Sequence, residues 1–467
     1  MDAARQLLGV LALAPSAMPW LGREPAVTLA VAAGAALLAL AAGLLWRHWR
    51  AGHGKAARRP DGVRELKERL RRRLAEPAQV FADQPAGPTP GASEAVEADL
   101  DKAAQGVLPE AGWRRGAARH VLRQTLNGGH SGNGALNGAE AAQWRQLGAL
   151  ALLDDPYDAL IAYGRAAELA PEDADLQLLL GVLNLRTGRL ETAEAAFRRQ
   201  LDLANGKDGG EAVMKYRAGT MLGDVLLARG ARGDALAAYE AALEELQALA
   251  GRDPANVHRR RDASVVHDRI GELLVAEGQL DMALESFRRS LEIAEALAAA
   301  DPASAGLQHD LSVAHDRIGE ALELQGDLDG ALASYRRGLE LSETVARREP
   351  ERQDWRWDVS LSLDRIGDVL AAKGNAEEAL SAYRRGLAIA EALAAADPTR
   401  MEWQRDLAVS CHKTGTLEAQ CGREGEAREV LERGRAIIAR LAEIARYRAQ
   451  WRADLSKFDA ALRGLGS

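Results

Sequence analysis

The sequence predicts an all-α protein in which an N-terminal transmembrane helix precedes a right-handed solenoid of stacked helical hairpins. Three observations carry this prediction: a 48-residue period in the C-terminal half, an uncharged apolar run near the N-terminus, and a composition rich in Ala, Leu, Arg and Glu, which favours helix over strand. A fixed period of this length indicates stacked units, none of which can bury its apolar face alone. The period is kept by two columns of glycines and one of aspartates: Gly223, Gly271, Gly319, Gly367 and Gly415; Gly230, Gly278, Gly326, Gly374 and Gly422; Asp262, Asp310, Asp358 and Asp406.

Residues 1–25 form a short apolar N-terminal segment whose structure the sequence leaves open. The apolar stretch from Leu7 to Leu21 is only 15 residues long and contains Pro15 and Pro19. It suits a short first span of a hairpin, a re-entrant segment or an interfacial helix. Its length favours the last two.

Residues 26–46 are the predicted transmembrane helix. They are 21 residues without a charge, and they end at Trp46. That length crosses the hydrocarbon core of a bilayer, and a terminal tryptophan suits the membrane interface. A cleaved signal peptide fits less well, because no short basic region precedes the run and a strongly basic stretch follows it.

Basic residues set the expected orientation of this helix. Only Arg5 and Arg23 precede it, whereas five follow it closely: Arg47, Arg50, Lys55, Arg58 and Arg59. The positive-inside rule therefore places the following residues in the cytoplasm. We expect a single-pass membrane protein, of the bacterial inner-membrane type, with its repeats in the cytoplasm.

Residues 47–76 are expected to contain a basic juxtamembrane helix. Val63 to Leu74 read VRELKERLRRRL, with apolar residues at helical spacing along one face. One interpretation is a helix that lies on anionic lipid headgroups, and the other is a solvated helix whose charges only enforce topology. The candidate lipid-contacting residues are Arg64, Lys67, Arg69, Arg71, Arg72 and Arg73.

Residues 77–138 are expected to be linkers with short helices. Residues 77–93 concentrate Pro and Gly, which disfavour regular structure. Helical pieces are expected at 93–105 and 113–126. Residues 127–138, NGGHSGNGALNG, are expected to be a second flexible linker because Gly and Asn dominate them.

Residues 139–446 are expected to form about seven repeat units, and residues 447–467 a capping helix. In the unit 258–302, Val266, Ile270 and Leu273 have the spacing of one helix face. Gly278 then suits the left-handed residue that follows a helix end. A second helix ends at Asp301-Pro302, because proline cannot continue a helix.

These units resemble the tetratricopeptide repeat family. Trp144-x2-Leu147-Gly148, Ala159-x3-Tyr163 and Pro171 reproduce the family signature, and Ile270-Gly271 with Ala283-x3-Phe287 repeats it in a longer unit. The later units are similar in length to kinesin light chain repeats, here in a membrane-anchored protein of bacterial type. The resemblance implies a superhelix that binds proteins rather than an enzyme.

The sequence contains no motif for catalysis, a metal or a cofactor. Phosphate-binding loops, nucleophile elbows and HExxH motifs are absent. Cys411 and Cys421 lack a second pair for a zinc site, and equivalent histidines such as His267 and His315 are one repeat apart, too far to share a metal. Residues 74–467 carry a formal charge of about −16, which argues against nucleic acid as a partner. We expect no enzyme activity, cofactor or metal.

An acidic ladder is the candidate binding site. Its members recur four residues apart on the first helix of three units: Asp268, Glu272, Asp316, Glu320, Asp364 and Asp368. The resemblance implies that these columns line the concave groove, where they would receive a basic peptide or protein segment. The alternative is neutralisation by arginines, either on the same helix (Arg269, Arg317, Arg365) or on the second (Arg288-Arg289, Arg336-Arg337, Arg384-Arg385).

The function these features predict is a membrane-tethered scaffold whose repeats recruit protein partners at the cytoplasmic face. An alternative is an envelope-assembly or chaperone-type factor with its repeats outside the cytoplasm, which would need the reverse topology. A third is a regulatory subunit of a membrane-associated enzyme.

Overall fold

The computed structural model describes residues 64–69, 92–110, 115–128, 134–204, 211–444 and 449–465, and its regular elements within these ranges are helices. The predicted all-helical repeat array is therefore confirmed. None of the helices formed by the described residues is both long and apolar enough to cross a membrane. The predicted segments at 1–25 and 26–46 lie outside the described residues.

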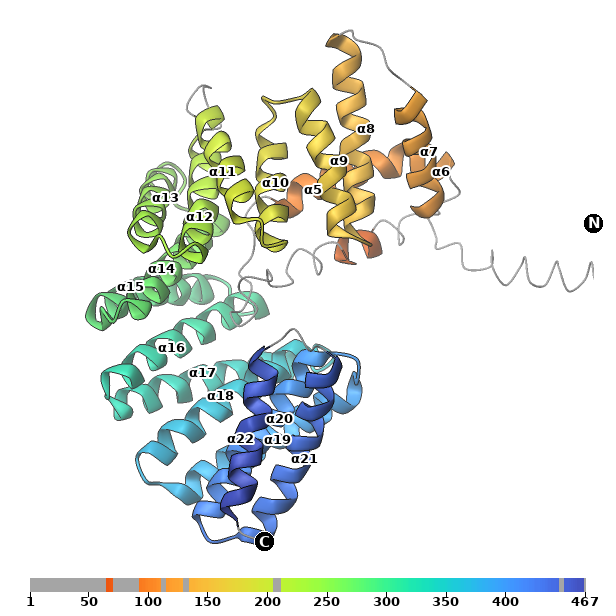
Figure 1. Cartoon of the computed structure of the whole chain (residues 1–467). Helices are drawn as coiled ribbons and strands as arrows, with labels where there is room; N and C mark the ends of the chain where they lie inside the picture. The colour runs from red at the N-terminus through yellow and green to blue at the C-terminus, as the bar shows by residue number, and fades with distance from the viewer. Residues whose placement is uncertain are drawn as a thin grey trace, which may run out of the picture.

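The described part of the chain begins with an N-terminal block and continues into paired helices (Figure 1). The block consists of a helix over 64–69, then α5 (Ala92–Gln105), α6 (Val107–Glu110) and α7 (Arg115–Gly128). The paired helices are α8 (Gly134–Leu152) with α9 (Pro156–Leu169), α10 (Ala174–Arg186) with α11 (Leu190–Ala204), α12 (Glu211–Ala228) with α13 (Arg232–Arg252), α14 (Val257–Ala276) with α15 (Leu280–Ala300), α16 (Ala305–Gln325) with α17 (Leu328–Arg348), α18 (Gln353–Ala372) with α19 (Ala376–Ala396), and α20 (Met401–Gln420) with α21 (Glu424–Ile444). A last helix, α22 (Ala449–Gly464), packs on α21.

In the six hairpins from α8 to α19, the two helices meet at a glycine that faces an aromatic ring; in the last hairpin Gly415 faces Leu431 instead. In α14 a side chain at Gly271 would collide with the ring of Phe287 in α15, so the two helices can cross closely only because this residue is glycine. The turn between them contains Gly278 at φ 73°, a left-handed conformation that glycine adopts without steric cost. Gly319 and Tyr335 repeat the first contact one unit later.

The links between hairpins follow from capping chemistry. α15 ends at Ala300, and the Asp301 amide donates back to the carbonyl of Leu297. Ser304 then caps α16, because its side chain accepts a hydrogen bond from the Leu307 amide at 3.4 Å. Successive helices pack in chain order, and the hairpins stack into the curved array of Figure 1.

The N-terminal block packs on the first hairpins. Helices α5 and α7 occupy the two regions expected to be helical, but α8 starts at Gly134, inside the segment expected to be a flexible linker. That expectation was wrong for residues 134–138, because the glycines there are taken into the first turns of a helix whose remainder packs against α5, α7 and α9.

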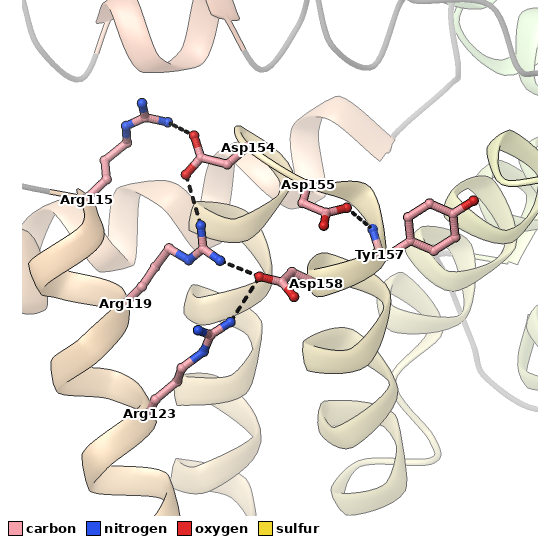
Figure 2. Close-up of polar contacts among 7 residues, drawn as sticks. All are labelled: Arg115, Arg119, Arg123, Asp154, Asp155, Tyr157 and Asp158. Atoms are coloured by element: carbon pink, nitrogen blue, oxygen red, sulfur yellow. Dashed lines mark hydrogen bonds and ion pairs between the residues drawn. The ribbon is translucent and has the colours of Figure 1, made fainter.

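Ion pairs fix α7 to the turn between α8 and α9 (Figure 2). Arg115 and Arg119 bind the two oxygens of Asp154 at 2.8 and 2.9 Å. Arg119 also contacts Asp158, which accepts a 3.0 Å bond from Arg123. Three arginines one turn apart thus bind two aspartates, which sets the position of α7 along the first hairpin.

The far end of the array is closed by α22. Its Trp451 and Phe458 are fully buried against α20 and α21. A side chain at Gly434 would collide with Phe458 and Cys411. The apolar side of the last hairpin is therefore covered by α22, which provides the cap that the end of a solenoid requires.

Candidate partner-binding face

The six predicted carboxylates lie on the first helices of three successive hairpins, α14, α16 and α18. First helices of neighbouring hairpins are joined by side-chain bonds, described below, so that α8, α10, α12, α14, α16, α18 and α20 contribute to one surface. We call it the first-helix face. The six residues differ in burial and in partners, so they do not form one uniform acidic row.

A first ladder joins α12 to α14, α14 to α16 and α18 to α20 through residues 45 apart. Arg269 of α14 lies 3.5 Å from Asp224 of α12. Arg317 of α16 contacts Glu272 of α14, and the Lys413 ammonium of α20 lies 2.6 Å from Asp368 of α18. We call these contacts the 45-residue ladder.

Tyrosines of the second helices support two rungs of this ladder. The hydroxyl of Tyr239 donates to Asp224 at 2.6 Å, and that of Tyr383 donates to Asp368 at the same distance. Burial raises the pKa of both hydroxyls, and the neighbouring carboxylates raise it further. Both tyrosines are therefore held as hydrogen-bond donors.

Glu320 is the rung at which the ladder is interrupted. Its counterpart in the next hairpin, Arg365, turns instead to Asp316 at 2.6 Å. The Tyr335 hydroxyl donates to Glu323 at 3.0 Å rather than to Glu320. Glu320 keeps a 3.4 Å contact with Arg317 of its own helix, and its side chain is 47% exposed. Asp368, with both rung partners, is 37% exposed.

A second ladder runs parallel to the first and joins residues 49 apart. Arg261 donates to Asp310 at 2.8 Å, and the Trp357 indole donates to Asp406 at 2.6 Å. The other rungs are His309 to Asp358 at 3.2 Å and Arg405 to Asp454 at 3.4 Å. The aspartate column visible in the sequence thus links consecutive hairpins.

Three aspartates are buried between the two helices of their hairpins: Asp268, Asp316 and Asp364. A Cβ at Gly338 would lie 2.6 Å from an oxygen of Asp316, so only glycine leaves room for that carboxylate. Asp364, 7% exposed, accepts a 2.8 Å bond from Ser410. In all three aspartates one oxygen is buried without a hydrogen-bond partner.

Burial is the main cause of the shifted titration of these three groups. It raises the pKa of Asp268 to about 7, and that of Asp316 and Asp364 to about 6, against the opposing effect of nearby Arg317, Arg365 and Lys413. Glu320 and Asp368 are thus the more exposed members of the predicted set, and the three aspartates are part of the hairpin interior.

Arginines of the second helices bind other acids. Arg336 lies 3.6 Å from Glu378, and Arg385 lies 2.7 Å from Glu343. Arg337 is bound to Glu340, and Arg289 to Glu285 and Glu292. Where ladder carboxylates are ion-paired, their cationic partners come from first helices.

The candidate lipid-contacting residues are described only in part. Arg64, Lys67 and Arg69 lie in the helix 64–69, and Arg71, Arg72 and Arg73 lie outside the described residues. The Lys67 ammonium binds Asp101 of α5 at 2.7 Å and is 3.9 Å from Glu97. Leu66 packs on the core of the first hairpins. This helix therefore docks on α5.

Helix α5 itself covers the first-helix face of the first two hairpins. It packs on α8 and α10, both first helices, and its Glu94 lies 3.2 Å from Arg217 of α12. Val96 and Leu100 are fully buried in this contact.

One buried ion cluster holds α5 in place. The Arg145 guanidinium binds both oxygens of Asp99 at 2.9 and 3.0 Å and also Asp173, which caps α10. Asp99 is 0% exposed and Arg145 12%. Burial raises the pKa of Asp99 more than Arg145 lowers it.

Sequence reasoning missed Asp224, Asp99 and Arg145. The two ladders could have been predicted from the sequence, because acidic and basic residues recur 45 and 49 positions apart. No comparable signal connects α5 to α8. In the described part of the chain, no group of three or more His, Cys, Asp or Glu is arranged to hold a metal.

Comparison with known proteins identifies the type of repeat. Residues 266–297 match the family model of the tetratricopeptide repeat, and the hairpins on either side have the same architecture, which confirms the resemblance found in the sequence. No curated protein sequence matches significantly. The apo form of RapI is similar at 16% identity and a TM-score of 0.49, over 79% of this chain and 95% of that one.

Two further solved structures are similar. A kinesin light chain protein of Podosopora anserina with nearly identical TPR-like repeats has 17% identity and a TM-score of 0.38, over 51% of this chain and 100% of that one. YrrB, described as a TPR protein with an unusual peptide-binding site, has 22% identity and a TM-score of 0.30, over 52% of this chain and 97% of that one.

Proposed function

Because the chain is built from tetratricopeptide-type repeats, we propose that it is a scaffold that recruits protein partners through its first-helix face and holds them at a membrane. The observation that carries this proposal is the division of that face. Its first part is covered by α5, whereas from α14 to α20 it presents half-buried side chains to solvent. No catalytic activity is part of the proposal.

Membrane attachment is proposed from the uncharged run 26–46 and the basic residues that follow it. The expected arrangement is a single span in a bacterial-type inner membrane, with the repeats in the cytoplasm. A reporter that is active only outside the cytoplasm, fused after Ser467, should stay inactive, and a cytoplasmic reporter at the same place should be active. The reverse pattern would favour an envelope-assembly factor.

Partner recruitment is tested by site-specific cross-linking in the full chain. A photoreactive residue at Val313 or Leu361, both half-buried on the first-helix face, should form an adduct with another protein in intact cells. The same residue at Arg337, exposed on α17, is the control. Equal adducts from all three positions, or none from the first two, would argue against the proposal.

A further inference from the structure

We propose that the open part of the first-helix face docks a basic amphipathic helix, one basic side chain of which completes the interrupted rung at Glu320. This inference rests on the proposed function and names the chemistry of the partner. Three observations lead to it: the seat already occupied by α5, the charge of the open face, and the missing partners of Glu320.

Helix α5 shows what this surface accepts. It lies on α8 and α10 with an apolar side made of small and medium residues, among them Ala95, Val96 and Leu100. A single charged residue within that side, Asp99, meets Arg145. The surface then continues through α12, where Arg217 meets Glu94, to α14, α16 and α18. A second helix could therefore lie farther along the same face.

The open part has the opposite charge preference. Across α14, α16 and α18, and apart from the three aspartates of the hairpin interior, the two ladders and the aspartate column contain six carboxylates, four arginines and one histidine. Val265, Val313 and Leu361 lie between the two ladders as a half-buried, apolar line. A helix with aliphatic residues against this line and basic residues beside it would be complementary in both respects.

Glu320 defines the position at which a basic residue of the partner helix would bind. Asp224 and Asp368 each bind a tyrosine hydroxyl and a cation from the next hairpin. Glu320 has neither, because Arg365 binds Asp316 and Tyr335 binds Glu323. Its own ion pair is the 3.4 Å contact with Arg317, which also binds Glu272. An incoming lysine or arginine would supply the cation that the next hairpin does not, beside a carboxylate that is already half-exposed, so the cost of removing water from it is small.

The probe is a synthetic peptide with the sequence of α5, residues 92–105, that carries Glu94→Lys, Glu97→Lys, Asp99→Lys and Asp101→Lys. The unaltered α5 peptide is its acidic control. Binding to the full chain is measured by fluorescence anisotropy at two salt concentrations. The basic peptide should bind, and more weakly at higher salt, whereas the acidic peptide should bind much less.

Two matched pairs of variants of the full chain test where the peptide binds. Glu320→Gln should weaken peptide binding about two- to fivefold, the range expected for an exposed ion pair, and Glu320→Lys by about tenfold, since it adds repulsion. Glu340→Gln and Glu340→Lys are the controls, because Glu340 is 67% exposed and also has an arginine three residues before it. They should leave binding unchanged, and all four variants should keep the wild-type melting temperature.

The inference would be overturned by no binding of the basic peptide, by equal loss in the Glu320 and Glu340 variants, or by equal binding of the acidic peptide. Binding that emerges only when Arg71, Arg72 and Arg73 are changed to Glu would also overturn it, because the chain's own basic segment would then be the occupant. Adducts at Val313 that persist in Glu320→Lys, together with no peptide binding, would leave the scaffold proposal standing and remove only this inference.

Discussion

The first two hairpins and the hairpins from α14 to α21 share one architecture, but they use their first-helix faces in opposite ways. In α8 and α10 the face buries the apolar side of α5 and one ion cluster around Arg145. In α14, α16 and α18 the same face is occupied by charged side chains that bind one another across hairpins. The glycine–aromatic contact closes hairpins of both kinds, so the face can change without altering the hairpin.

This difference separates the part of the face that stabilises the fold from the part that is available to bind a partner. Apolar residues at α5 contribute through burial, which needs no particular partner charge. The ladders contribute less per contact, because their ion pairs are partly exposed, and they leave Glu320 half-exposed and without a partner from the next hairpin.

The largest effect should come from breaking the buried cluster under α5. Arg145→Leu leaves the Asp99 carboxyl fully buried without its guanidinium partner, which should lower the free energy of unfolding by about 3–5 kcal/mol. Urea denaturation measures the loss, and protease cleavage should appear first between 92 and 110. The double variant Arg145→Leu with Asp99→Leu should recover much of the loss. A single variant as stable as the wild type would show that α5 is not held there.

An intermediate, pH-dependent effect is expected at Asp268 on the open face. Its pKa in the folded protein, raised by burial to about 7, exceeds the ordinary value of 3.8. The folded state therefore binds more protons than the unfolded state between about pH 4 and pH 7, and this group's contribution to stability falls as the pH rises through that window.

Asp268→Asn removes this penalty. The variant should be more stable than the wild type at pH 8, by about 1–2 kcal/mol, and the difference should shrink toward pH 4. Melting temperatures across this range measure it. Asp368→Asn is the control, because Asp368 is more exposed and bound to Lys413. A difference that grows as the pH is lowered would contradict the assignment of Asp268 to the hairpin interior.

The smallest effects should come from the ion pairs themselves. Arg317→Gln removes the partner that Glu272 has in the next hairpin and leaves it only Arg269 of its own helix. Because the Glu272 side chain is only 13% exposed, the change should cost about 1 kcal/mol. Arg337→Gln removes an exposed pair on α17 and should cost about 0.5 kcal/mol or less. Chemical denaturation of both variants ranks them. The reverse ranking would mean that the ladder does not couple α14 to α16.

Much of the fold could be predicted from the sequence because its causes are local and repeated. The contact between Gly271 and Phe287 recurs at one period, and glycines equivalent to Gly278 mark the hairpin turns from α10 to α21. The placement of α5 could not be predicted in this way. Its apolar residues indicate that one side is buried, but they do not indicate which surface covers it.

The candidate site was predictable only in outline. The columns of Asp268 and Glu272 are visible in the sequence, and both lie on first helices as their spacing implies. Their division into buried and exposed members depends on packing: Gly338 admits the Asp316 carboxylate between two helices. The choice of Arg365 between Asp316 and Glu320 is made by a side-chain conformation, which no residue pattern reports.

The central claim is that partners bind the open part of the first-helix face and not the part beneath α5. Amide hydrogen exchange of the full chain, with and without the basic α5-derived peptide, tests it directly. The account predicts slower exchange in α14, α16 and α18, with exchange in α5, α8 and α10 unchanged. Slower exchange confined to α8 and α10, together with faster exchange in α5, would show that the peptide displaces α5 and would contradict the account.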